Sequence, residues 1–536
     1  MSVYYSSNFN NLLFQQPTGI VMFRLFILLF ITSLTTACAV NPVTGEQQLM
    51  FMSEGEDAQI GQSQYKPAQQ SQGGLYYLDP ELTLYVASVG KKLAAVSDRP
   101  DLPYEFVILN NSVPNAWALP SGKIALNRGL LIKLKDESQL AAVLSHEIVH
   151  AAARHSAQRM QQGMIVQAGM MGLGLAVEGN DYKDLIIGGA TLGAGLTTAQ
   201  YGQDHELESD HYGMKYMAKA GYDLQGAVEL QILFVELSKN HQSSWLQGLF
   251  ASHPPSQSRV EANRENVLTY PSSGNYRGKE TFQKNMKYLL SKTSAYAAQD
   301  KAMSLIAKKN VSQALTEIEK AIKKEPNEAS FYATKGDIYS AQGKDSLALK
   351  QYEKSVALFP EQFSSHLKKG IANEKLGNIE QAKKDLARSA QLLPTSVAAL
   401  QLGNIAQNQG DQRNAMRYYG SAAQAEGANG QQARIKLAKL ELPGQPNKYI
   451  KIKHKLGKNG ELQVYAENRS EISVIEIEVE SSLIDSKGAI QKKERWKIKQ
   501  TVRPKTRSRT QKDPVADILP KGYRVKASVL SASIAK

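Results

Sequence analysis

The chain has 536 residues, of which 42% are hydrophobic and 21% are charged. That length is too great for one hydrophobic core and predicts three or four domains, while the composition excludes a chain that is disordered throughout. The single cysteine excludes an internal disulfide and a zinc site built from cysteines. The net charge is +14, and residues 441–536 account for most of it, with 21 Lys and Arg against 11 Asp and Glu.

The N-terminus predicts an export signal. A basic residue precedes the apolar run 25–31, and small residues then lead to Cys38. A cysteine directly after those small residues resembles a bacterial lipobox, so we expect lipid on Cys38. Residues 1–21 are polar and unlike a signal, which favours translation from Met22. Thr35 stands where such boxes prefer leucine, and the alternative is a plain secretory signal with an incidental cysteine.

Residues 41–271 mix helical periodicity with short extended segments. The longest helical pattern covers Lys135–Gln162, with Asp136 as its expected N-cap. Before it, two short strands are predicted around a Pro-Ser-Gly turn at 120–122. Residues 163–200 are rich in Gly, Ala, Met and Leu. We interpret them as buried helices, and contact with a membrane or a hydrophobic client is the alternative.

The pentapeptide His-Glu-Ile-Val-His at 146–150 lies within that helical pattern. Histidines four residues apart lie on one helical face, so the rings of His146 and His150 can reach one metal ion. Glu147 is then placed to take a proton from a metal-bound water, which is the arrangement of zinc peptidases. The pattern is moderately specific, because three fixed positions in five residues recur by chance.

Two histidines need a third protein ligand to complete such a zinc site. The acidic segment Glu-Leu-Glu-Ser-Asp at 206–210 lies on a predicted second helix downstream. One carboxylate of this segment can supply the ligand, and another four residues later can hydrogen-bond a ligand histidine. A solvated acidic helix face is the alternative interpretation.

Residues 298–430 repeat with a period of 34 residues, the third period being one residue shorter. The period, the small residue at each helix crossing and the proline after each second helix resemble the tetratricopeptide repeat. Such units stack into a solenoid with a concave surface for a partner. The repeated positions are Pro326, Pro360 and Pro394, together with Ala314, Ala348, Ala382 and Ala415.

After residue 445 the hydrophobic period changes to two, which predicts strands. About 90 residues of such strands indicate a small β-sandwich. The basic run Arg503–Lys512 has the charge to attract anionic lipid or acidic partners. We favour a solvated face for this run, because that is the more frequent case.

Five segments together resemble the CAAX-prenyl-protease-type family of gluzincin zinc metallopeptidases, in its bacterial envelope branch with tetratricopeptide repeats. The resemblance covers residues 41 to about 265 and does not extend to the β-rich tail. It implies a mainly α zincin-type metallopeptidase domain with a small sheet. The five segments are residues 41–45 (Asn-Pro-Val-Thr-Gly), residues 115–122 (Asn-Ala-Trp-Ala-Leu-Pro-Ser-Gly), residues 146–150, residues 206–210, and His253-Pro254 with Arg259.

The resemblance also implies a role for each matching residue. One Zn²⁺ would be held by His146, His150 and Glu206, with Glu147 as the catalytic base and Asp210 supporting a ligand. His253 matches a histidine that either stabilises the oxyanion or coordinates the metal in a resting form. Arg259 matches an arginine that contacts the substrate.

Two further groups of residues complete the predicted site. The strand region around Ala118, Leu119 and Leu126 is expected to pair with an extended substrate, which would favour unfolded chains. Nearby histidines are expected to be structural or to lie at the surface, and these are His155, His205 and His211.

Together these features predict a zinc-dependent endopeptidase of the bacterial envelope that cleaves unfolded or misassembled envelope and outer-membrane proteins recruited by the repeats. We expect a periplasmic protein, anchored to the outer membrane through Cys38, with outer-membrane assembly machinery as a partner and no nucleic acid. The alternative is a chaperone or assembly scaffold with latent proteolysis. A hydrolase of prenylated peptides is disfavoured because no multi-span membrane core is predicted. The expected domains are a signal segment at 1–37, the metallopeptidase at 38–290, the repeats at 298–438 and the β-domain at 445–536.

Overall fold

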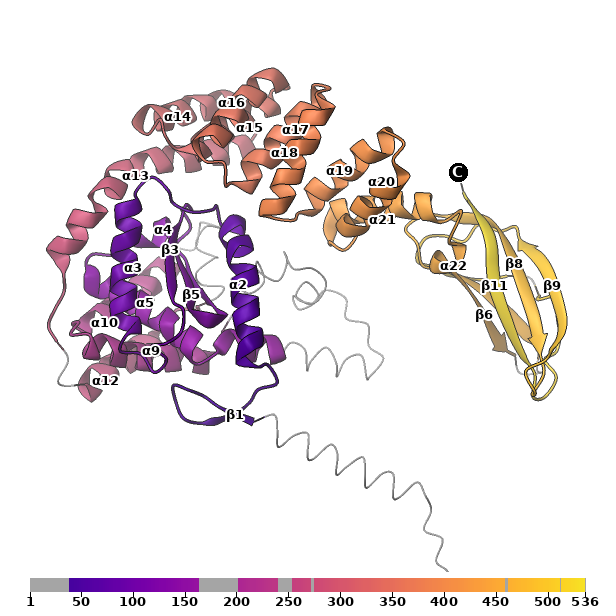
Figure 1. Ribbon diagram of the computed structural model, residues 1–536, viewed down its shortest axis with the longest axis horizontal. Helices are drawn as coiled ribbons and strands as arrows, with labels where there is room; N and C mark the ends of the chain where they lie inside the picture. Colours follow the sequence, from indigo (N-terminus) through magenta and orange to yellow (C-terminus); the bar gives the residue numbers. More distant parts are fainter. Residues whose placement is uncertain are drawn as a thin grey trace, which may run out of the picture.

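The computed structural model describes residues 38–162, 201–239, 253–270, 274–457, 461–510 and 512–535. An N-terminal domain, an arc of paired helices and a β-domain follow one another along the chain (Figure 1). The expected signal segment and the stretch 163–200 lie outside the described residues. Within the described ranges, none of the helices combines the length and the apolar character needed to cross a membrane.

The N-terminal domain places helices around a three-stranded sheet. The sheet has the order β3-β5-β4, with β5 parallel to β3 and antiparallel to β4. A hairpin of two short strands precedes it. The strands are β1 (Cys38–Val40), β2 (Gln47–Leu49), β3 (Glu105–Leu109), β4 (Ala116–Leu119) and β5 (Lys123–Asn127), and the helices are α2 (Glu54–Ser71), α3 (Pro80–Ala94), α4 (Arg128–Leu131), α5 (Glu137–Ala152), α9 (Gln203–Lys219), α10 (Gln225–Lys239) and α12 (Gln257–Thr269).

The predicted turn between two strands is present and separates β4 from β5. A short 3-10 segment at Pro120–Gly122 joins them. The sheet order makes β4 an edge strand, whereas β5 is hydrogen-bonded on both sides. The expectation that Leu126 pairs with substrate is therefore wrong, because this residue lies on the central strand. Ala118 and Leu119 lie on the edge strand.

The long helical pattern forms two helical segments instead of one. Asp136 caps α5 as expected, with its side chain accepting a hydrogen bond from the backbone N–H of Gln139. The helix ends at Ala152, and Arg154 adopts a left-handed backbone conformation with φ of 61°. The guanidinium of Arg154 forms a buried ion pair with Asp57 of α2, which stabilises this uncommon conformation. Residues 155–162 are helical again in a new direction.

The solenoid consists of antiparallel helix pairs, as the 34-residue period predicts. Helix α13 continues without interruption from residue 279 to 307, so the expected boundary at 290–298 lies inside a helix instead of in a linker. The alanines at the repeated crossing positions are fully buried. The helices are α13 (Lys279–Ala307), α14 (Val311–Lys324), α15 (Ala329–Ala341), α16 (Asp345–Leu358), α17 (Phe363–Lys375), α18 (Ile379–Leu392), α19 (Ser396–Asn408), α20 (Gln412–Ala422) and α21 (Gly427–Glu441).

The first repeats pack directly on the N-terminal domain. The ring of Tyr77 stacks on Phe359 at a centroid distance of 4.5 Å, and its hydroxyl donates to the carbonyl oxygen of Asn327. The side chain of Gln70 bonds the backbone of the α16–α17 loop twice, donating to Glu361 O and accepting from Phe363 N. Because these hydrogen bonds go to backbone groups, they fix the position of the first repeats relative to the N-terminal domain.

Arg128 is the centre of a second contact between the N-terminal domain and the solenoid. It is 3% exposed, and its guanidinium lies 3.4 Å from the ring centroid of Tyr296 on α13. The same guanidinium donates to Asn110 Oδ1 and Ser112 Oγ, in the segment that leads to the edge strand β4. Glu328 of the solenoid accepts from Asn110 Nδ2 and from the Tyr296 hydroxyl. Residues of the solenoid thus complete the packing of the segment before the edge strand.

The β-domain consists of two three-stranded sheets, in the orders β10-β7-β6 and β11-β8-β9. Apolar side chains of both sheets, including those of Val464 and Val479, form one core between them. The predicted β-sandwich is therefore present. Its elements are α22 (Pro446–Tyr449), β6 (Ile450–Leu456), β7 (Leu462–Asn468), β8 (Val474–Ile484), β9 (Ile490–Ile498), β10 (Arg507–Arg509) and β11 (Arg524–Ile534).

We expect Arg128→Ala to lower the free energy of unfolding by about 2–3 kcal/mol, because it removes buried hydrogen bonds to a charged group and a cation–π contact. Urea denaturation followed by tryptophan fluorescence would measure the change. Arg388→Ala is the control, since it removes an exposed ion pair with Glu361 that is worth less than about 1 kcal/mol. Equal denaturation midpoints for wild type and Arg128→Ala would contradict a stabilising contact between the two bodies.

Candidate metal centre

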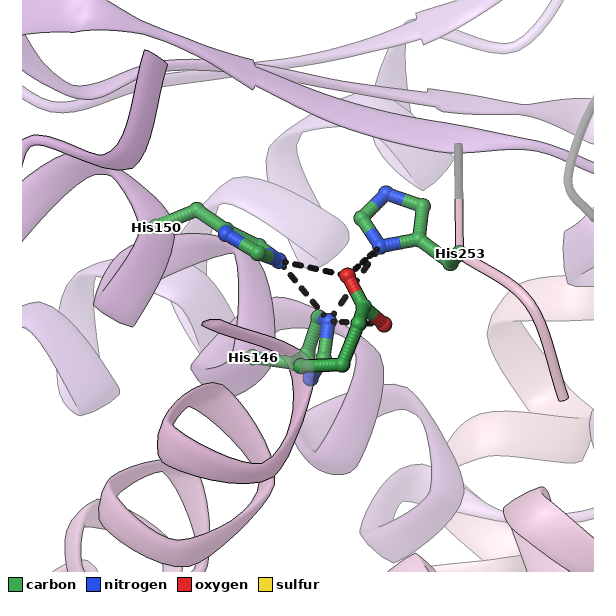
Figure 2. Close-up of side chains that lie close together, drawn as sticks. His146, His150 and His253 are labelled. Carbon is green, nitrogen blue, oxygen red and sulfur yellow. Dashed lines mark hydrogen bonds and ion pairs between the residues drawn. The ribbon is translucent and has the colours of Figure 1, made fainter. Parts of the chain in front are cut away.

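The two histidines of the pentapeptide lie one turn apart on α5 and point the same way (Figure 2). Their Nε2 atoms are 3.0 Å apart. His146 Nδ1 lies 2.9 Å from Asp210 Oδ1, so its Nδ1–H donates to that carboxylate. This bond leaves His146 Nε2 without a proton and available to a metal.

Glu206 of α9 completes the group. Its Oε1 is 3.4 Å from His150 Nε2, and its Oε2 is 3.6 Å from His146 Nε2. Glu206 is 1% exposed and His150 is 1% exposed. Burial holds the pKa of His150 well below its usual value, which keeps the ring neutral as a metal ligand requires.

His253 comes from the segment before α12 and reaches the same point. Its Nδ1 lies 2.9 Å from Glu206 Oε1 and 3.4 Å from His146 Nε2. One ligand atom from each of His146, His150, Glu206 and His253 lies within 4.8 Å of all the others. Of the two roles implied for His253, this position favours metal coordination.

Arg259 lies on α12 and is 2% exposed. Its Nε and Nη2 donate to the two oxygens of Asp210, at 2.7 and 2.8 Å, and its Nη1 is 2.6 Å from Glu206 Oε2. Burial alone would raise the pKa of Glu206, but the charges of His253 and Arg259 outweigh it and hold this pKa well below its usual range. Arg259 therefore keeps Glu206 ionised, and its expected contact with substrate stays a prediction.

Glu147 is buried beside the ligand cluster and does not belong to it. Burial raises the pKa of its carboxyl group. Its Oε1 lies 3.6 Å from His253 Nε2, and its Oε2 is buried with no hydrogen-bond partner among the residues that the structure describes. An oxygen of Glu147 is thus free to exchange a proton with a molecule bound in the site.

His155, which the sequence indicates to be structural, lies against the candidate ligand His150. The two Nδ1 atoms are 2.8 Å apart, and His155 is fully buried. For Nε2 of His150 to bind a metal, its proton must be on Nδ1, where it donates to His155 Nδ1. His155 then has its own proton on Nε2, which lies 3.4 Å from Glu208 Oε1. The same oxygen accepts from Asn41 Nδ2 at 2.9 Å.

This chain of contacts connects the N-terminal hairpin to the metal centre. Asn41 also turns the hairpin, because its Oδ1 accepts from the backbone N–H of Val43. In the sequence, these contacts are signalled only by the Asn-Pro-Val-Thr-Gly segment at 41–45. Its spacing from the other motifs does not predict a role for it. His205 stacks on His155 at 4.2 Å, and His211 bonds Asn266 and Tyr270, so both have structural contacts in place of ligand positions.

Comparison with known proteins agrees with this geometry. Peptidase family M48 matches residues 80–267, and a tetratricopeptide repeat matches residues 329–362. This chain carries a peptidase family M48 domain. The resemblance to a zinc metallopeptidase family with tetratricopeptide repeats is thereby confirmed.

Named relatives of the M48 domain cover similar segments. The beta-barrel assembly-enhancing protease of Escherichia coli is 28% identical over 236 residues, which are 42% of this chain and 47% of that protein. The mitochondrial metalloendopeptidase OMA1 of Schizosaccharomyces pombe is 30% identical over 42% of this chain and 65% of that protein. The metalloprotease YcaL of Escherichia coli is 26% identical over 34% of this chain and 70% of that protein. The chain thus spans about half the length of the beta-barrel assembly-enhancing protease that it matches.

Among solved structures, that of PilW, titled a widely conserved type IV pilus biogenesis factor, is 16% identical with a TM-score of 0.27. The match covers 40% of this chain and 86% of the PilW chain, and a TM-score this low gives no guide to function.

The donor set of the M48 domain fits zinc. Peptidases of this family use zinc, and two imidazoles with one carboxylate are a donor set of catalytic zinc sites. The hydrogen bonds at both Nδ1 atoms fix the rings so that the Nε2 atoms converge. His146, His150 and Glu206 would hold the ion, with His253 within reach of the fourth position.

We expect His155→Ala in the M48 domain to raise the dissociation constant for zinc by about 10–100-fold, because His150 loses the group that orients its ring. Competition with a chromogenic chelator would measure the constant. His211→Ala is the matched control, since its partners Asn266 and Tyr270 lie outside the ligand cluster. Unchanged zinc affinity in a folded His155→Ala protein would contradict the orienting role.

Proposed function

We propose that this chain is a zinc-dependent endopeptidase of the bacterial cell envelope that cleaves unfolded or misassembled envelope proteins. The observation that carries the proposal is the buried cluster of His146, His150 and Glu206, with the unpartnered oxygen of Glu147 beside it. The match to peptidase family M48 and to a beta-barrel assembly-enhancing protease supports both the chemistry and the location.

Glu147 is the residue that moves the proton. Zinc bound by the three ligands would polarise a peptide carbonyl and lower the pKa of a water molecule to about 7. Glu147 Oε2 accepts the proton as the new bond to the carbonyl carbon forms, and the same carboxyl then delivers it to the leaving amine. A cavity next to Glu147 is lined by Val143, Leu230 and Phe234 and suits an apolar side chain of the substrate.

The edge strand β4 is the part of the sheet that can take up an extended substrate. A segment that adds to β4 would continue the sheet through backbone hydrogen bonds, which folded proteins cannot offer. The carbonyl oxygen of Ala118 now accepts from Ser156 Oγ at 3.2 Å, and a substrate strand would replace that bond. Ala118 and Leu119 are therefore the proposed substrate strand, and unfolded chains are the proposed substrate class.

The solenoid is proposed to hold the clients. Its contacts at Tyr77 and Arg128 fix it on the M48 domain, so a client bound to its concave surface stays within reach of the metal centre. We propose the periplasm as the location, with lipid on Cys38 as an anchor in the outer membrane and the assembly machinery of that membrane as a partner.

A chaperone or scaffold with latent proteolysis is the second candidate, and one observation favours it. His253 Nδ1 lies among the ligand atoms, where it would occupy the position that a substrate needs. Complementation of an envelope defect separates the two functions: rescue by wild type but not by Glu147→Gln supports the peptidase, and equal rescue by both supports the scaffold.

We expect Glu147→Gln to reduce the rate of casein cleavage by at least about 100-fold, because the amide cannot accept the proton. Zinc content, measured by atomic absorption, is expected to stay at one ion per chain, since Glu147 is not a ligand. Glu265→Gln on the exposed side of α12 is the control and should cleave at the wild-type rate. Cleavage by a zinc-loaded Glu147→Gln protein would contradict the proposed mechanism.

We expect His253→Ala to raise the initial rate of casein cleavage several-fold while zinc stays bound, because the three remaining ligands suffice to hold it. Initial rates at equal zinc loading would test this. A reduced rate at full zinc occupancy would instead assign His253 to stabilisation of the reacting carbonyl oxygen.

A further inference from the structure

The outer face of one sheet of the β-domain carries a cluster of positive charge. On β6, Ile450 and Ile452 point into the core and Lys451, Lys453 and Lys455 point outward. On β10, Arg507 and Arg509 are exposed on the same side, because they pair with the outward residues of β7. We call these five cations the basic face.

Few acidic groups balance the basic face. Glu467 is in its centre and pairs with Lys453 and with Arg469. Arg507 lies over the ring of Tyr465, 4.3 Å from its centroid. Within the described ranges, Lys451, Lys455 and Arg507 form no ion pair with a carboxylate. The basic face therefore keeps a net positive charge exposed to solvent.

The outer face of the opposite sheet is different. There Arg495 and Lys497 of β9 lie directly across from Glu480 and Glu478 of β8. Glu480 pairs with Lys493 at 2.8 Å and with Arg495 at 3.1 Å. Pairing with Glu480 thus neutralises part of the charge on this face, whereas three of the five cations of the basic face have no such partner within the described ranges.

Three exposed aliphatic residues lie at strand ends of the β-domain, and Figure 1 shows that these strands end away from the solenoid. Leu456 ends β6 and is 54% exposed, and Ile518 bridges to Glu461 at the start of β7 and is 64% exposed. Ile490 begins β9 at the same end and is 60% exposed. We call these three residues the aliphatic tip.

We propose that the aliphatic tip and the basic face together dock on an anionic lipid membrane. Lysine and arginine bind lipid phosphates at the surface, while aliphatic side chains enter the layer below the headgroups. An acidic protein or another soluble polyanion would explain the cations but not three exposed aliphatic residues at one end of the domain. A single acyl chain binds a membrane only reversibly, so this surface would supply the second contact beside the lipid expected on Cys38.

Sedimentation with phospholipid vesicles tests the proposal. Every protein in this test is the full chain with Cys38→Ser, so that no acyl chain can attach at this position. We expect this protein to sediment with vesicles that contain phosphatidylglycerol and to stay in solution with pure phosphatidylcholine. Failure to sediment with the anionic vesicles would overturn the proposal.

Two matched triple variants locate the surface. Lys451→Gln, Lys455→Gln and Arg507→Gln together should weaken binding at least about tenfold. Lys493→Gln, Arg495→Gln and Lys526→Gln remove the same charge from the opposite face and should leave binding nearly unchanged. Equal losses in both variants would overturn the assignment to the basic face.

A third variant tests the tip. Leu456→Ser, Ile490→Ser and Ile518→Ser together should weaken vesicle binding at high salt, where the electrostatic part is screened. Circular dichroism would confirm that each variant is folded. If the tip variant bound vesicles as well as the parent protein and dextran sulfate displaced the vesicles fully, the surface would be a general polyanion site. That result would overturn the membrane assignment.

Discussion

The guanidinium of Arg259 lies between the buried carboxylates of Asp210 and Glu206, and the geometry of the metal centre depends on this contact. Two carboxylates four residues apart on one helix cannot both stay ionised in a buried site without a cation between them. The planar guanidinium satisfies both at once, which an ammonium group would not do as well. Asp210 is then held against His146, and Glu206 lies against the Nε2 atoms of His146 and His150, so the candidate ligands of α5 and α9 meet.

A second constraint acts on the other candidate ligand, His150. The helix that carries His150 stops at Ala152, and the left-handed Arg154 turns the chain so that His155 comes back to His150. In an uninterrupted helix the side chains at 150 and 155 would point to different sides. The break is held by the ion pair of Arg154 with Asp57, a residue of a helix far away in the sequence. The orientation of His150 thus depends on a contact with a residue that is distant in the sequence.

A buried arginine also determines how the N-terminal domain and the solenoid pack together. Arg128 joins the segment before the edge strand to Tyr296 and Glu328 of the solenoid, so the part that is proposed to hold clients is packed on the part that is proposed to bind substrate. The β-domain contributes differently, because most of its charges lie on its outer faces, although Glu471 pairs with Arg434 of the solenoid. Its strand alternation sorts the residues into a core side and an outward side.

The sequence by itself determined the features that arise within one helical turn, one strand or one repeat. These include the spacing of His146 and His150, the cap at Asp136 and the 34-residue period of the solenoid, because local backbone geometry sets them. The acidic segment at 206–210 was found for the same reason, although which carboxylate meets the metal depended on resemblance. The β-sandwich followed from the period of two.

Only the tertiary structure decided the contacts between residues distant in the chain. The roles of His155 and Arg259, the central position of Leu126 and the helix that spans the expected domain boundary belong to this group. Each depends on which buried charges and backbone groups find partners when the elements pack. Leaving a buried polar group unpaired costs more free energy than local secondary-structure propensity contributes. Spacing along the chain contains no information about that pairing, so the metal-binding pair was readable from the sequence and the groups that orient it were not.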